Sequence, residues 1–124
     1  ITGSLYNDED RPPVNVEGES VVRLPSDAGE GEGIELRLKS GEETSAALYV
    51  GASLKVDLKD DDPVLHIKVG DGSAELKIES DGTVTLISGS AINIEGGDIA
   101  LKGTTITAEA DGEMTLKGSV INLN

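Results

Sequence analysis

From residue 92 the sequence reads INIEGGD (92–98), IALKGTT (99–105), ITAEADGE (106–113), MTLKGSV (114–120) and INLN (121–124). Each unit opens with two apolar residues separated by one other residue, and successive units begin seven or eight residues apart. Alternation with a period of two predicts a short β-strand with one apolar face. A unit this short buries only two side chains, so it cannot form a core by itself.

Three identical chains around a three-fold axis are the simplest arrangement that gives these units a core. Each chain then supplies one wall at each level, and the apolar pairs meet on the axis. We therefore expect an all-β, intertwined, homotrimeric, triple-stranded β-helix that tapers toward the C-terminus. The expected axial core residues are Leu65, Ile67, Leu76, Ile92, Ile94, Ile99, Leu101, Ile106, Met114, Leu116, Ile121 and Leu123. Glycines in the corners are expected to adopt positive φ; these are Gly89, Gly96, Gly97, Gly103, Gly112 and Gly118.

Longer units of the same alternation precede the repeat. Period-two patterns predict strands at 34–39, 54–59, 65–69, 74–79 and from 84, with shorter strands at 20–24 and 46–50. Glycine, aspartate and proline between these segments predict turns, including 29–33 and 60–63. No segment has helical spacing, so we expect essentially no helix.

Composition excludes several classes of protein. The 124 residues contain no Cys, Trp or Phe, one His, and 24 Asp+Glu against 10 Lys+Arg, for a net charge of −14. Without Cys there are no disulfide scaffolds or thiolate metal sites, and one His cannot form a zinc-binding cluster within a chain. The negative charge argues against nucleic acid and anionic membranes as electrostatic partners. The shortage of aromatic residues suits a thin core repeated along an axis.

Two segments carry a resemblance to a known family. Residues 1–13, ITGSLYNDEDRPP, resemble the end of the OB-fold domain and the Pro-rich exit in the baseplate assembly protein V family, the central spikes of contractile-tailed bacteriophages. Residues 34–124 resemble the trimeric β-helix of that family. The implied organisation is the OB-fold end at 1–13, a linker with a short strand at 14–33, the wide shaft at 34–90, and the narrow shaft and tip at 91–124. Because the sequence starts in mid-pattern, we expect that an N-terminal part has been removed.

The resemblance implies a mechanical, non-catalytic role. Such a homotrimer sits at the tip of the virion's tail baseplate, and sheath contraction drives it through the outer membrane of a Gram-negative host toward the periplasm. Its implied partners are a baseplate hub protein, which binds through the N-terminal domain, and a tip-capping protein, with no nucleic acid. The alternatives are the needle of a type VI secretion system or a contractile bacteriocin and, less favoured, a glycan-binding trimeric tail fibre.

The tip departs from the family pattern. Many members carry a His-x-His motif that binds an axial iron ion, whereas the tip here is Val120, Ile121, Asn122, Leu123 and Asn124. We expect no catalytic, cofactor-binding or metal-binding residues. The Asn122 and Asn124 amides are expected to point outward, although an axial ion near the tip stays open. His66 is expected to point outward beside Lys68, and the acidic run at 60–62 is interpreted as a turn rather than a calcium loop.

Overall fold

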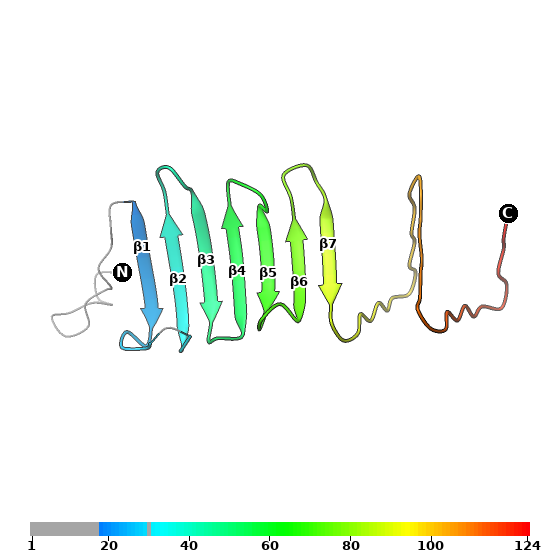
Figure 1. Cartoon of the computed structure of the whole chain (residues 1–124), viewed down its shortest axis with the longest axis horizontal. Helices are drawn as coiled ribbons and strands as arrows, with labels where there is room; N and C mark the ends of the chain where they lie inside the picture. Colours follow the sequence, from blue (N-terminus) through cyan, green and yellow to red (C-terminus); the bar gives the residue numbers. More distant parts are fainter. Residues whose placement is uncertain (1–17, 30) are drawn as a thin grey trace. The chain divides into compact units, whose positions relative to one another are not determined.

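Seven β-strands, each paired with the next along the chain, form one antiparallel sheet (Figure 1). The computed structural model describes residues 18–29 and 31–124. The strands are β1 (Glu19–Leu24), β2 (Ile34–Lys39), β3 (Ser45–Val50), β4 (Leu54–Lys59), β5 (Leu65–Val69), β6 (Ala74–Ile78) and β7 (Val84–Ser88). These positions confirm the strands expected from the alternation. The described residues contain no helix, as expected, and therefore none long and apolar enough to span a membrane.

The strand register sorts the side chains into two faces. Leu36 of β2 lies opposite Leu48 of β3, and Arg37 lies opposite Ala47. The central row of the apolar face runs, in strand order, Val22, Leu36, Leu48, Val56, Ile67, Leu76 and Leu86. The opposite, polar face has a row with Arg23, Glu35, Tyr49, Lys55, Lys68, Glu75 and Ile87. The period of two in the sequence is thus preserved across the whole sheet.

The apolar face of the sheet is open to solvent. On β2, the apolar residues Ile34, Leu36 and Leu38 are all exposed, whereas the charged residues between them are half-buried. Among the described residues only Val21, Ala28 and Ala47 are buried. Val21 and Ala47 lie on the polar face. They flank Arg37 of β2, Val21 from β1 and Ala47 from β3. The sheet of one chain therefore has no hydrophobic core on its apolar side.

A second unit comprises Asn93–Asn124. All of its residues are exposed, and none belongs to a strand. The first apolar residue of a repeat is the less exposed of each pair: Ile99 is 54% exposed and Leu101 is 79% exposed, and Ile121 and Leu123 are 52% and 86% exposed. Within residues 18–29 and 31–124 these repeats have neither a hydrogen-bonded neighbouring strand nor a covered apolar side.

The expectation of positive φ at the corner glycines is wrong. Positive φ occurs instead at glycines of the sheet's turns, such as Gly51 (57°), Gly70 (58°) and Gly82 (89°), and at none of the six expected positions. The repeats contain no hairpin that would require the left-handed region. A Cβ atom on Gly103 would instead lie 3.2 Å from the carbonyl oxygen of Thr105, so this glycine permits a close backbone approach.

These strands do not bear on two parts of the expected organisation. The expected end of an OB-fold at 1–13 lies outside the described residues. The divisions at 14–33, 34–90 and 91–124, and the trimeric β-helix itself, stay predictions. The single chain shows the coarser class, an all-β fold built on a seven-stranded antiparallel sheet.

Candidate functional site

The expected axial core residues fall into two groups. Leu65, Ile67 and Leu76 are half-buried on the apolar face of β5 and β6. The remaining members are exposed; they are Ile92, Ile94, Ile99, Leu101, Ile106, Met114, Leu116, Ile121 and Leu123. Monomeric soluble proteins rarely expose so many large apolar side chains, so their exposure here needs an explanation. We call the apolar side of the sheet the assembly surface, and treat the exposed apolar residues of the repeats separately.

The polar face concentrates the positive charge of an acidic chain. Seven of the ten Lys and Arg residues lie in the strands, against four acidic residues, and the register places all of them on this one face. The seven cations are Arg23, Arg37, Lys39, Lys55, Lys59, Lys68 and Lys77. The remaining Asp and Glu residues lie in the turns, in the second unit, or outside the described residues. The net charge of −14 therefore does not describe this surface.

An arginine–glutamate cluster lies at the β1–β2 side of this face. Arg23 donates from Nε and Nη2 to Oε1 of Glu35, at 3.2 and 2.5 Å. Arg37 Nη2 donates to the same oxygen at 3.3 Å. The Arg23 guanidinium is the main cause of a pKa for Glu35 below its ordinary value, and burial acts in the opposite direction. Glu35 is thus held as an anion between two cations.

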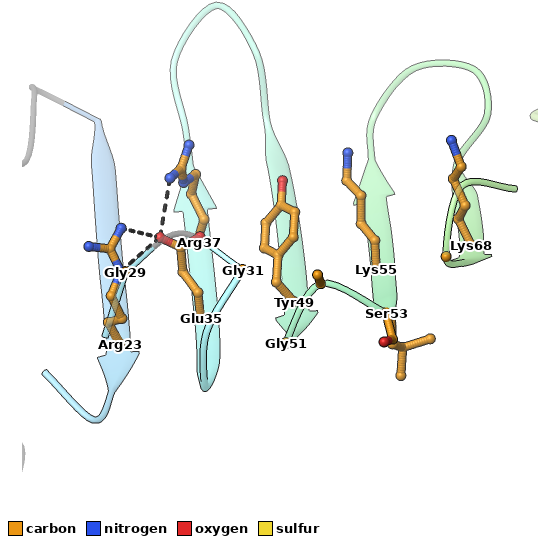
Figure 2. A pocket seen from close by; sticks show the side chains of 13 residues that line it. Arg23, Gly29, Gly31, Glu35, Arg37, Tyr49, Gly51, Ser53, Lys55 and Lys68 are labelled. Carbon is orange, nitrogen blue, oxygen red and sulfur yellow. Dashed lines mark hydrogen bonds and ion pairs between the residues drawn. The ribbon is translucent and has the colours of Figure 1, made fainter. Parts of the chain in front are cut away.

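Lysines continue the row on β4 and β5. Lys55 Nζ lies 3.0 Å from Asp57 Oδ2 and 5.5 Å from the centre of the Tyr49 ring. The hydrogen bond to Asp57 raises the pKa of Lys55, while partial burial opposes the shift. In Figure 2 the side chains of Arg37, Tyr49, Lys55 and Lys68 extend the same way from their strands. Together with turn residues they line a groove of about 320 Å³, which we call the cationic groove.

His66 lies outward on the polar face, as expected, but it is half-buried rather than freely solvated. Its Nε2 lies 2.8 Å from Oε2 of Glu75, and Lys77 Nζ lies 3.4 Å from the same oxygen. The hydrogen bond from His66 is the main cause of the lowered pKa of Glu75, and Lys77 adds to it. His66 therefore belongs to a surface ion-pair cluster.

The acidic run at 60–62 forms a turn between β4 and β5, as interpreted from its composition. Asp62 Oδ1 accepts a hydrogen bond from Ser80 N at 2.6 Å, so this carboxylate ties the turn to the β6–β7 connection. Within residues 18–29 and 31–124, no group of three or more acidic or His side chains is arranged to hold a metal ion. The tip residues Val120 to Asn124 are all exposed.

Sequence reasoning missed the cationic groove. The signal was present in the alternate positions of the strands taken together, where seven Lys and Arg residues stand against four Asp and Glu residues. A total charge averaged over the chain conceals that segregation. No protein-family model and no curated protein matches this sequence.

Proposed function

We propose that this chain is the shaft of a homotrimeric central spike of a contractile-tailed bacteriophage. In this role the trimer is driven through the outer membrane of a Gram-negative host when the tail sheath contracts. The role is mechanical and non-catalytic. The proposal combines the resemblance of residues 1–13 and 34–124 with the geometry of the assembly surface.

The inverted exposure on β2 is the observation that carries the proposal furthest. Leu38 is 44% exposed, while its charged neighbours Arg37 and Lys39 are half-buried. Removal of apolar area from water contributes roughly 25 cal/mol per Å². A single chain forgoes a substantial part of that contribution on this face, so we expect folding and association to be one event.

Residues 93–124 favour three chains over two. Each repeat offers one short apolar edge of two residues, such as Ile99 and Leu101, and has no hydrogen-bonded neighbouring strand in the described part of its own chain. Two such edges leave the sides of a core open, whereas three walls enclose it and supply strand neighbours. In this arrangement the polar face of the sheet stays outside.

The mechanical role follows from the same arrangement. A sheet continued around three chains has few open edges and resists bending. No chain of an interleaved trimer can unfold before all three chains separate, so unfolding is slow. Both properties suit a shaft that is loaded along its axis.

A secretion or bacteriocin needle would use the same geometry, so these alternatives differ in their assembly rather than in their fold. The genes that flank this one distinguish them: tail, capsid and packaging genes together support a phage spike, and secretion genes without capsid genes contradict it. A glycan-binding fibre is less favoured, because Tyr49 is the only aromatic residue among the described positions and it is half-buried.

Absolute mass in solution tests the assembly. Light scattering should give about 38 kDa, three times the 12.8 kDa of one chain. The band should persist in SDS without heating and collapse to the monomer after boiling. A folded monomer, or a stable dimer, would overturn the trimeric shaft.

Immuno-electron microscopy tests the function itself. Antibodies against the recombinant oligomer should label intact particles at the baseplate tip. Labelling along fibres or sheath, with none at the tip, would contradict a central spike even if the protein is a trimer.

A further inference from the structure

We propose that the cationic groove binds a phosphate monoester as its dianion. Four cations from four strands line the groove: Arg23, Arg37, Lys55 and Lys68. Among the described residues that line the groove, the only carboxylate is that of Glu35. The volume of about 320 Å³ lies at the lower end of the range for small-molecule sites, about 300–1,000 Å³.

The groove retains unused hydrogen-bond donors. Glu35 is shared between two arginines through one oxygen, so it does not neutralise both. Arg37 Nε is buried without a hydrogen-bond partner in the described part of the chain, and the Glu19 carboxylate lies 3.8 Å away. Lys68 forms no ion pair with any residue of 18–29 or 31–124. A buried donor without a partner costs free energy. The Arg37 side chain as a whole is 37% exposed and lines the groove, so its guanidinium remains accessible to a ligand.

A phosphate monoester fits these donors better than a singly charged group does. The cations that line the groove outnumber the carboxylates among its described lining residues, and the three terminal oxygens of a phosphate monoester accept from several donors at once. Arg37 and Lys68 supply charged donors from β2 and β5, and the Tyr49 hydroxyl extends between them from β3 (Figure 2). Carboxylates and phosphodiesters carry one charge, so we expect them to bind more weakly.

The open rim of the groove allows the ligand to approach. Gly31, Gly51 and Gly70 belong to its lining. A Cβ atom on Gly51 or Gly70 would meet no atom of the described residues closer than 3.7 Å, so none of their side chains crowds this edge. The organic part of a monoester can therefore project past the turns into solvent.

This inference is independent of the proposed spike function. The groove lies on the polar face, and the assembly surface is the opposite face of the same sheet. A protein that binds phosphate as a monomer would support the groove and contradict the trimer. A trimer that does not bind phosphate would support the trimeric shaft and contradict the groove.

Isothermal titration with glucose 1-phosphate tests the site in the full chain. We expect saturable binding that weakens as salt is added, and no binding of glucose. Lys68→Gln should weaken binding about tenfold, because it removes one charge-assisted hydrogen bond. Lys39→Gln is the matched control: Lys39 lies on the same face of β2, outside the lining of the groove, and its loss should leave affinity unchanged within about twofold.

A second arm identifies the source of the phosphate. Vesicles of phosphatidylcholine with phosphatidic acid present the same monoester on a lipid, and pure phosphatidylcholine vesicles are the control. Binding to glucose 1-phosphate alone assigns a soluble ligand, and binding to phosphatidic acid alone assigns a lipid headgroup. Absence of both, or equal weakening by Lys39→Gln and Lys68→Gln, would overturn the proposal. Circular dichroism of each variant checks that it folds. If Lys68→Gln does not fold, Lys55→Gln removes a different positive charge from the groove.

Discussion

Leu36 and Leu48 face each other directly across β2 and β3, and both are 36% exposed. They lie in the central row of the apolar face, with strands on both sides. A leucine pair at the centre of a sheet is normally covered by another layer of protein. The partly exposed pair therefore marks apolar area that the proposed contact between chains would cover.

Leu48→Asp should abolish assembly. A carboxylate at this position would be buried in an apolar contact without a partner, at a cost of several kcal/mol per chain. Light scattering should then give the mass of one chain, or the protein should be recovered as aggregate. Ser45→Asp is the control, because Ser45 lies on the polar face of β3 opposite Lys39 and Lys59. Assembly of both variants with equal mass would show that the apolar face is not the contact.

Glycines of the repeats should differ in their tolerance of a side chain. In Gly103→Ala the new Cβ would lie 3.2 Å from Thr105 O, so we expect a loss of about 1–3 kcal/mol. A Cβ atom added at Gly112 would meet no atom of the described residues within 4 Å, apart from its neighbours in the chain. Gly112→Ala should therefore be neutral, or stabilise by about 0.4–1 kcal/mol because alanine lowers the conformational entropy of the unfolded chain. Thermal unfolding at equal concentration measures both. A greater loss for Gly112→Ala would mean that another chain occupies the space beside it.

Glu35 should make the free energy of unfolding depend on pH in the acidic range. Arg23 keeps the pKa of Glu35 below its ordinary value of about 4.5, so in acid the unfolded chain takes up the proton before the folded chain does. The stabilising contribution is therefore complete above about pH 5 and disappears as pH falls through the lower, folded-state pKa. Glu35→Gln should be less stable than the wild type at pH 7, with a smaller difference at pH 3.

Urea unfolding at pH 7, 5 and 3 measures this difference. Glu42→Gln provides the control, because Glu42 is an exposed residue outside the strands. It removes the same charge without removing the contacts to Arg23 and Arg37. A constant difference between wild type and Glu35→Gln over the whole pH range would contradict the assignment.

The strands could be predicted because their alternation is local. Ile34, Leu36 and Leu38 fix both the extent and the two faces of β2, and the same reasoning correctly placed His66 outward. The Arg23–Glu35 pair could not be predicted in this way. Its members are 12 residues apart and meet only through the β1–β2 register, which depends on the length and course of the connecting turn.

The cationic groove escaped prediction for a related reason. Lys55 and Lys68 become neighbours only when β4 and β5 pair in register. In the sequence they are two of several lysines in a strongly acidic chain. Residues 93–124 posed a different problem, because their alternation is typical of strands although none of these residues belongs to a strand. The repeat predicts strands there, but their partners belong to other copies in the proposed trimer.

The tip provides the last prediction. Asn122 and Asn124 alternate with Ile121 and Leu123, so apolar side chains on the axis would place both amides outward. We therefore expect dialysed protein to contain no stoichiometric metal, and Asn124→Ala to leave its mass and thermal stability unchanged. Elemental analysis by mass spectrometry measures the metal content. One cation per three chains, lost in Asn124→Ala and kept in the outward-facing control Thr115→Ala, would instead place the amide oxygens on the axis, where they suit a hard cation.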